Sequence, residues 1–372
     1  MYKLWSLIPG TLAAVGVMMA GFWMADHLGH ALLASQGLSG SSPISGVPVA
    51  IVLGLLLRNL LPLPDALSPG LKFSTTAILR MGIVLVGIRL SVFDVLTLGI
   101  AGLPVVLSAI ITGLVFVTWF NKRLGLPPRL GTLIAAGTSI CGVTAIVSVA
   151  PAIEADEQEV AYAVANVVAF GLFGMLTYPY LAHAVLGSSE TIGLFLGTAV
   201  HDTSQVVGAA LTYKQMYADD VVLRVATVTK LTRNIFLAGV IPLLTWMHHR
   251  SAPAHLSGAK RLSWKQLVPG FVIGFLAMAG VRSIGDATLG SSGMAFGMWD
   301  AKAWGSLTNQ VGDYWASRIF LGTAMAAVGL NTSFSVFKGM GLKPFAVGLA
   351  GAAAVGIVGM TMAIIFGRFV SL

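Results

Sequence analysis

The sequence has few charged residues and almost no cysteine. Asp, Glu, Lys and Arg make up 10% of the 372 residues, whereas soluble globular domains carry roughly 25%. With 56% hydrophobic residues, the chain has too little polar surface to face water on all sides, and a lipid bilayer is the solvent that fits. The single cysteine, Cys141, excludes an internal disulfide and a site built from several thiolates.

Common catalytic and nucleotide-binding motifs are also missing. The sequence has no HExxH pair, no Walker A loop and no GxGxxG fingerprint. Its net charge of +8 need not indicate nucleic acid, because excess Lys and Arg in a membrane protein usually mark cytoplasmic loops. We therefore expect no enzyme activity, no cofactor and no nucleic-acid partner, with the lipid bilayer as the surroundings.

Eleven stretches are apolar and long enough to be membrane segments, since a spanning helix needs roughly 20 mostly apolar residues. They cover residues 7–25, 46–63, 73–92, 95–120, 129–153, 160–186, 190–213, 220–247, 266–284, 309–333 and 344–369. The first is longer than the apolar core of a signal peptide, so we expect a retained helix. The predicted fold class is an all-α membrane protein without a soluble domain.

The distribution of basic residues predicts the orientation of the chain. Loop 26–45 lacks Lys and Arg, which suits the outer side. The residues assigned to the inner side are Lys3, Lys72, Lys122, Arg123, Arg129, Arg250, Lys260, Arg261, Lys265, Lys338 and Lys343. We expect a multi-pass protein of the bacterial inner membrane with a cytoplasmic N-terminus.

Two internal repeats organise the chain. Gly137-Thr-Ser-Ile-Cys-Gly142 resembles Gly197-Thr-Ala-Val-His-Asp202, and each is followed by an acidic stretch and a helix with a late proline. A fainter repeat relates Val86-Gly-Ile-Arg-Leu-Ser91 to Val328-Gly-Leu-Asn-Thr-Ser333, together with Val47-Pro48 and Val268-Pro269. We divide the chain into an N-terminal helix and outer loop (1–45), scaffold helices (46–120), a core (129–247) and second-half helices (266–369).

The charge pattern gives the paired scaffold elements opposite directions, an arrangement typical of inverted-repeat transporters. Segments 129–153 and 190–213 both contain Gly and polar residues at their centres, which predicts broken helices. If both cross the membrane, they run in the same direction; if both are re-entrant hairpins, every pair is inverted. Both alternatives remain open.

Broken helices predict an anion site, because the first N–H groups of a helix are unpaired and carry partial positive charge. The expected substrate-binding residues are Thr138, Ser139, Cys141, Gly142, Thr144, His201, Thr203, Ser204 and Gln205. Close packing of small polar residues is the alternative interpretation. Cys141 on its own suits a small packing residue.

Charged residues within membrane segments are costly unless paired or hydrated. The expected charge-carrying and coupling residues are Asp202, Lys230, Arg233 and Arg80. Lys230 is either a counter-ion of Asp202 or half of a proton-coupling pair, and His201 is either a proton relay or a packed core residue. Arg80 and Arg89 have the alternative of extending to the membrane surface.

Three stretches resemble the bacterial sulfate exporter family of the YeiH type: Leu79-Arg80-Met-Gly82 through Ser91, Gly137 to Gly142 followed by Ala150-Pro151, and Gly197 to Ala209. The resemblance spans nearly the whole chain. It implies a distant similarity to bile acid symporters and sodium/proton antiporters. Proteins of that fold have a core domain with two crossing broken helices and a panel domain that often dimerises. There the broken helices cross the membrane.

These features together predict a secondary active transporter of a small anion of the sulfate, sulfonate or carboxylate class. We expect an exporter coupled to protons or sodium, without a bound metal, that forms a homodimer. The alternatives are a sodium/proton antiporter that uses Asp202, a channel, and a membrane enzyme built on Asp219-Asp220.

Overall fold

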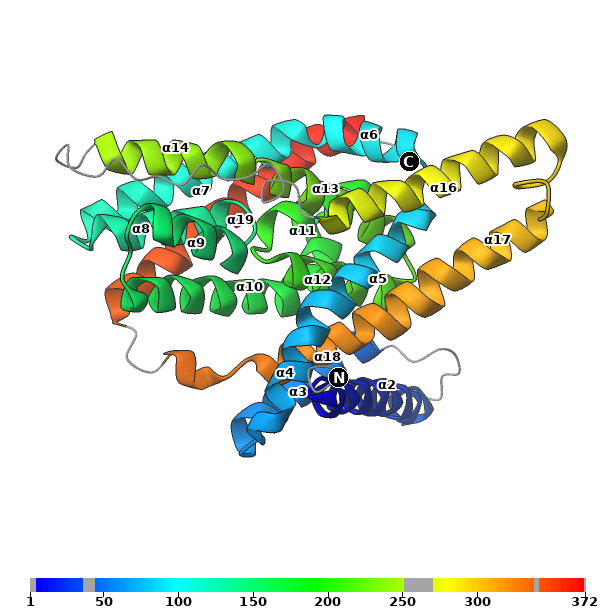
Figure 1. Cartoon of the computed structure of the whole chain (residues 1–372), viewed down its shortest axis with the longest axis horizontal. Helices are drawn as coiled ribbons and strands as arrows, with labels where there is room; N and C mark the ends of the chain where they lie inside the picture. The colour runs from blue at the N-terminus through cyan, green and yellow to red at the C-terminus, as the bar shows by residue number, and fades with distance from the viewer. Residues whose placement is uncertain (1–4, 36–43, 251–269, 338–340, 371–372) are drawn as a thin grey trace. The chain divides into compact units, whose positions relative to one another are not determined.

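The computed structural model describes residues 5–35, 44–250, 270–337 and 341–370, and within them the regular elements are helices (Figure 1). One isolated bridge between Ala295 and Trp299 is the exception. The predicted all-α class is therefore confirmed. Several residues of the predicted charge pattern and repeat lie outside the described residues: Lys3, Lys260, Arg261, Lys265, Lys338, Val268 and Pro269.

Within the described residues, six helical runs are long and apolar enough to cross a membrane. They are Ile8–Ala31, Asp65–Arg89, Leu103–Arg123, Glu157–Val185, Gly270–Ser292 and Leu342–Phe369. Each matches one of the eleven expected segments. The other five fall on shorter or interrupted helices, so the eleven-segment topology stays a prediction.

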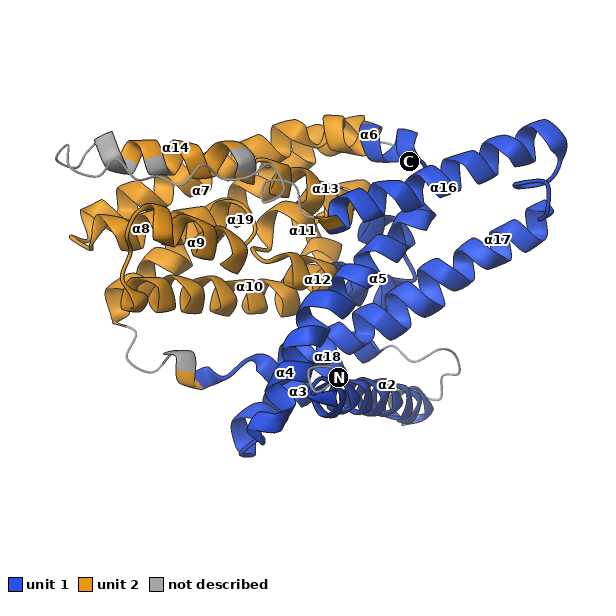
Figure 2. Cartoon of the chain, in the orientation of Figure 1, with its two compact units in different colours: residues 1–96, 210–224, 271–334 blue, residues 97–209, 225–270, 335–372 orange. Residues whose placement is uncertain are grey.

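The chain divides into two compact units, each assembled from segments that are distant in sequence (Figure 2). Unit 1 contains residues 1–96, 210–224 and 271–334, and unit 2 contains residues 97–209, 225–270 and 335–372. Three helices contribute residues to both: α6 (Val92–Ala101), α12 (Thr203–Tyr217) and α13 (Asp220–Ile235).

The helices of unit 1 come from both ends of the chain. In order they are α2 (Ile8–Ser35), α3 (Gly46–Leu60), η1 (Asp65–Leu67), α4 (Ser68–Phe73), η2 (Ser74–Ile78), α5 (Leu79–Val86), η3 (Gly87–Arg89), α16 (Gly270–Ser292), α17 (Ala301–Asn309), η5 (Gln310–Leu321) and α18 (Gly322–Asn331). Helix α3 packs against α2 and α18, and α5 packs against η5. Helices α2 and α4 approach closely at Gly10 and Gly70, where an added Cβ would lie 2.0 and 2.2 Å from a backbone oxygen.

Two π-helical segments lie in unit 1. Segment η2 is one, and the twelve-residue η5 is the other. Figure 1 shows α17, η5 and α18 as one long ribbon. Such stretches are rare and often lie at functional sites, and hydrophobic periodicity gives no sign of them.

The fainter repeat coincides with matching element boundaries. One helical run ends at Arg89 and the other at Asn331, and the next element begins at Val92 and Phe334 respectively. Each pair of positions is separated by 242 residues, which is also the offset between Val86 and Val328 in the sequence repeat.

A cluster of five charged side chains lies in unit 1. Asp220 forms ion pairs with Arg89 at 2.6 Å, with Lys214 at 2.7 Å and with Arg224 at 3.3 Å. Asp313 pairs with Arg89 at 3.2 Å and also with Lys214. The Arg89 side chain is only 19% exposed. Arg89 is therefore paired with two carboxylates within unit 1, and its extension to the membrane surface stays a prediction.

Unit 2 is a helical bundle around the two interrupted segments. Its helices are α7 (Leu103–Arg123), α8 (Pro128–Ser139), α9 (Val143–Val149), η4 (Ala150–Ala152), α10 (Glu157–Val185), α11 (Ser189–Ala199), α14 (Leu237–Arg250), η6 (Phe334–Phe337, partly), α19 (Leu342–Phe366) and η7 (Gly367–Phe369). Helix α19 packs along α7 and against α10 and α11, and α8 packs against α7 and α10.

Two expected single helices are divided. The stretch 95–120 consists of α6 and α7, which meet at Gly102, and Pro104 stands in the first turn of α7 where its missing N–H costs nothing. The stretch 220–247 consists of α13 and α14, with Phe236 between them. Hydrophobicity alone does not show where one helix ends and the next begins, because the helices on both sides are apolar.

The two acidic stretches are helix caps. Asp156 begins α10: its carboxylate accepts from the Glu159 N–H at 2.8 Å, and the Glu159 carboxylate accepts from the Asp156 N–H at 3.1 Å. This reciprocal pair is a capping box. Asp219 accepts from the Val221 N–H at 2.9 Å at the start of α13.

Candidate functional site

The predicted breaks occur in both core segments, at matching positions. Helix α8 ends at Ser139 and α9 begins at Val143, while α11 ends at Ala199 and α12 begins at Thr203. The two ends are 60 residues apart, as are the two restarts. Each break is therefore three residues long, and the sequence repeat locates both.

The first break turns sharply at a glycine. Gly142 has φ +71° and ψ −128°, a conformation that is unfavourable for residues with a Cβ. Its N–H donates to the Gly137 carbonyl at 3.1 Å. An added Cβ at Gly137 would lie 2.8 Å from the Ile146 side chain, whereas nine residues of straight helix span about 13.5 Å. Helix α9 is therefore not a collinear continuation of α8.

The second break is closed by hydrogen bonds that cap the start of α12. The Asp202 carboxylate accepts from the Ser204 N–H at 2.9 Å and from the Ser204 hydroxyl at 2.6 Å. In return, the Gln205 amide oxygen accepts from the Asp202 N–H at 3.3 Å. This pattern satisfies free N–H groups at the start of α12. The Gln205 amide also donates to the Val168 carbonyl of α10 at 3.2 Å.

Asp202 also brings the two breaks together. An added Cβ at Gly142 would lie 2.9 Å from Oδ2 of Asp202. One carboxylate therefore faces the start of α9 with one oxygen and the start of α12 with the other. Both helix starts carry partial positive charge, so Asp202 occupies the place predicted for an anion.

Lys230 of α13 binds the carbonyl side of both breaks. Its ammonium donates to the Ile140 carbonyl at 2.8 Å, to the Val200 carbonyl at 3.3 Å and to the His201 carbonyl. The side chain is 1% exposed. No salt bridge joins Lys230 to a carboxylate among the described residues, so Lys230 neutralises helix ends rather than pairing with Asp202.

Arg233 lies one turn further along α13 and repeats this arrangement. Its guanidinium donates to the Ser139 carbonyl at 2.6 Å, the Thr198 carbonyl at 2.7 Å, the Val200 carbonyl at 3.4 Å and the Thr138 carbonyl. It is completely buried. The carbonyl end of a helix carries partial negative charge, which explains how two cations are tolerated here.

The charges around the breaks do not cancel. Lys230 and Arg233 are buried, and Asp202 is the partly buried carboxylate beside them. Two cations and one anion leave one positive charge in excess. Because an uncompensated buried charge is costly, a negatively charged ligand would be stabilised next to this group.

Several buried polar atoms near the breaks have no hydrogen-bond partner among the residues that the structure describes. These are the Ser139 hydroxyl, both ring nitrogens of His201, the Thr229 hydroxyl and the Asn234 amide oxygen. Buried polar groups are normally satisfied by protein, water or ligand. The His201 side chain is almost completely buried, with 2% of the residue exposed. The backbone of Ala199 lies close to its ring.

The remaining predicted residues divide between the two units. The Thr203 hydroxyl accepts from the Asn234 amide at 3.3 Å, and Cys141 is 5% exposed in the first break. Thr144 is exposed on α9. Arg80 belongs to unit 1, where it is exposed and its guanidinium lies 5.8 Å from the Phe271 ring centre.

Sequence reasoning missed three features of this site. It did not assign the Ile140 and Val200 carbonyls as cation ligands, and it did not select Asn234 or Thr229. The signal that was available is the spacing of Lys230, Arg233 and Asn234, which places all three within one turn of a helix that follows two breaks.

The fold and this site define a polytopic membrane protein whose core contains two interrupted helices fastened to one basic helix. The chain belongs to the family described as "Conserved hypothetical protein 698", whose profile matches residues 11–348. The sulfate assignment implied by the sequence resemblance is not part of that description.

Relatives from three bacteria carry the description "UPF0324 membrane protein". The Streptococcus pneumoniae R6 protein spr0034 is 33% identical over 297 residues, covering 80% of this chain and 82% of the relative. Atu0671 of Agrobacterium fabrum is 34% identical over 281 residues, covering 75% of each chain. The Corynebacterium glutamicum protein Cgl0015/cg0018 is 36% identical over 256 residues, covering 68% and 70%. These similarities support a multi-pass membrane protein.

Proposed function

We propose that this protein is a secondary transporter of a small anion of the sulfate, sulfonate or carboxylate class, and that it is not an enzyme. The observation that carries the proposal is the meeting of two helix starts at Gly142 and Asp202, beside an excess of buried positive charge. The matched element boundaries of both repeats support the inverted-repeat architecture common among such transporters.

Asp202 acts in this proposal as an internal competitor of the substrate. Its carboxylate accepts from the Ser204 N–H and hydroxyl, which are donors that an anionic substrate needs. A proton on Asp202 removes this competing charge, so that the partial positive charge of the helix starts can act on the substrate. In this way the proposal couples anion transport to protons.

The other charged and titratable groups that face Asp202 do not change their charge or their partners in this proposal. Lys230 and Arg233 approach from α13 and remain bound to backbone carbonyls. Cys141 approaches from the first break, and His201 precedes Asp202 in the second. Asp202 is the group whose charge changes during binding.

A ligand-binding measurement tests the proposal. Sulfate, a small sulfonate and a small carboxylate are added to the purified protein, and the melting temperature is followed. We expect stabilisation by at least one of them. Replacing both Thr203 and Ser204 by Ala should abolish this stabilisation, while Thr288→Ala on α16 of unit 1 serves as the control. Unchanged stabilisation in the double variant would remove the site from α12.

A sodium/proton antiporter is the alternative function. Asp202 favours it, because a partly buried carboxylate between two helix breaks suits a site that exchanges cations. Uptake into vesicles under imposed sodium and pH gradients separates the two functions. Sodium-dependent proton movement without any added anion would support the antiporter. Asp219 and Asp220, in contrast, lie in a cap and an ionic cluster, which speaks against a catalytic pair.

A further inference from the structure

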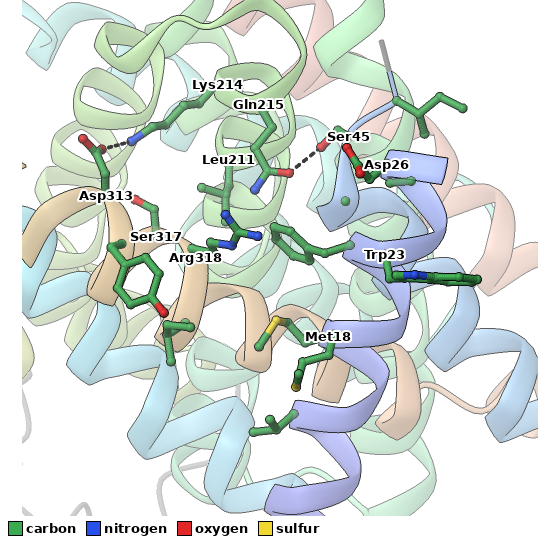
Figure 3. A pocket seen from close by; sticks show the side chains of 18 residues that line it. Met18, Trp23, Asp26, Ser45, Leu211, Lys214, Gln215, Asp313, Ser317 and Arg318 are labelled. Carbon is green, nitrogen blue, oxygen red and sulfur yellow. Dashed lines mark hydrogen bonds and ion pairs between the residues drawn. The ribbon is translucent and has the colours of Figure 1, made fainter. Parts of the chain in front are cut away.

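A cavity of about 980 Å³ lies within unit 1, apart from the helix breaks of unit 2 (Figure 3). Its walls come from α2, the start of α3, the unit 1 part of α12, and η5. The lining residues are Val15, Met18, Met19, Phe22, Trp23, Ala25, Asp26, Ile44, Ser45, Gly46, Leu211, Lys214, Gln215, Asp313, Tyr314, Ser317, Arg318 and Ile319. Its volume reaches the upper range of pockets that bind organic ligands, roughly 300–1,000 Å³.

The walls of this cavity have two chemistries. Helix α2 supplies a wall of apolar side chains, including Met18, Phe22 and Trp23. The opposite wall is polar and contains Lys214 and Asp313, which are paired with each other. Figure 3 shows both walls facing the same space. A ligand that fills the cavity therefore needs an apolar part and a polar part.

Arg318 is the cation of this cavity that has no carboxylate partner among the described residues. Its guanidinium lies 5.6 Å from the centre of the Phe22 ring, and the residue is exposed. Figure 3 shows it in the middle of the lining side chains. The segment that carries Arg318 is expected at membrane depth, where an unpaired charge is costly. A negative group on the ligand would provide the missing partner.

The charged residues that line the cavity are balanced in number: Lys214 and Arg318 are the cations, and Asp26 and Asp313 are the carboxylates. Because Lys214 is paired with Asp313, Arg318 is the cation that is available to a ligand. Because the apolar wall belongs to α2, a candidate membrane span, the apolar part of the ligand comes from the bilayer itself.

We propose that this cavity binds a phospholipid with an anionic headgroup. The phosphate pairs with Arg318, and an acyl chain lies along Met18, Met19 and Phe22. Free phosphate is also an anion but leaves the apolar wall uncovered, so the lipid is the source that fits the cavity. This site is independent of the transport proposal because its residues lie in unit 1.

Native mass spectrometry of the full-length protein tests this site. The protein in detergent is mixed with dioleoylphosphatidylglycerol, dioleoylphosphatidylcholine or inorganic phosphate, and lipid adducts and melting temperatures are recorded. We expect retention and stabilisation with the phosphatidylglycerol alone. Arg318→Gln should weaken its binding about tenfold, as expected for the loss of one charge-assisted contact, and Arg318→Lys should restore part of it.

The matched control is Arg80→Gln. Arg80 is also an exposed arginine of unit 1 beside a phenylalanine ring, but it does not line the cavity. Its replacement should leave lipid binding unchanged. Equal retention of both lipids, full stabilisation by inorganic phosphate, or wild-type lipid binding by Arg318→Gln would each overturn the proposal.

Discussion

The two helix breaks of unit 2 have the same length but different chemistry. The first, Ile140-Cys141-Gly142, has no side chain that caps the helix after it, and it depends on the left-handed backbone of Gly142. The second, Val200-His201-Asp202, carries its own capping side chain, Asp202. The comparison shows that two breaks of a repeat can differ in chemistry. The second break supplies the Asp202 carboxylate, and the first supplies the space beside Gly142 that receives it.

The largest expected effect comes from removing a cation that serves both breaks. Lys230→Met deprives the Ile140 and His201 carbonyls of this donor, whereas the Val200 carbonyl keeps Arg233 at 3.4 Å. Each buried carbonyl without a partner costs about 1–3 kcal/mol, so we expect a loss of about 2–6 kcal/mol. Melting in detergent measures this loss, with the exposed Lys302→Met as the control. A variant that melts like the wild type would show that other donors satisfy both breaks.

The next effect distinguishes the first break from the second. Gly142→Ala places a Cβ 2.9 Å from the Asp202 carboxylate at a positive φ, and we expect a destabilisation of about 2–3 kcal/mol. Gly125→Ala is the matched control, because Gly125 has φ +68° and open space around it. It should cost about 1 kcal/mol from backbone strain alone. Equal losses in both would mean that contact with Asp202 contributes nothing.

A smaller effect on stability, but a sharp effect on binding, is expected from Asp202→Asn. Asn caps helices about as well as Asp, so the free energy of unfolding should change by less than about 1 kcal/mol. Without the competing charge, anion binding should become stronger. Isothermal titration of the variant and the wild type with the stabilising anion measures the difference. If the variant binds the anion no more tightly than the wild type, the charge of Asp202 does not compete with the substrate.

The smallest effect tests whether the exposed face of α9 belongs to the site. Thr144 was predicted to bind substrate, but it is exposed. Thr144→Ala should change stability by no more than about 0.5 kcal/mol and leave anion-induced stabilisation intact. Loss of that stabilisation would move the substrate from the Asp202 side of the first break to the Thr144 side.

The sequence was most informative where a pattern is local. Small and polar residues within apolar runs located both breaks, and the repeat assigned them matching ends at Ser139 and Ala199. It was less informative about partners. The residues around Lys230 do not indicate that it binds carbonyls rather than Asp202. Every residue has a backbone carbonyl, so the amino-acid sequence does not identify which carbonyls act as acceptors.

Features assembled from distant segments were not predictable. The cavity of unit 1 combines α2, α12 and η5, and the ionic cluster joins Arg89 to Asp220 and Asp313. Hydrophobic periodicity describes each helix separately and does not report which helices meet. The joint at Gly102 was hidden for a related reason, since both flanking helices are apolar.

Lys230 and Arg233 have a mechanical consequence beyond their charge. They stand three residues apart on α13, and each donates to carbonyls of both interrupted helices. A shift of α13 by one turn would therefore remove hydrogen-bond donors from both interrupted helices at once. Such a movement would release both breaks together.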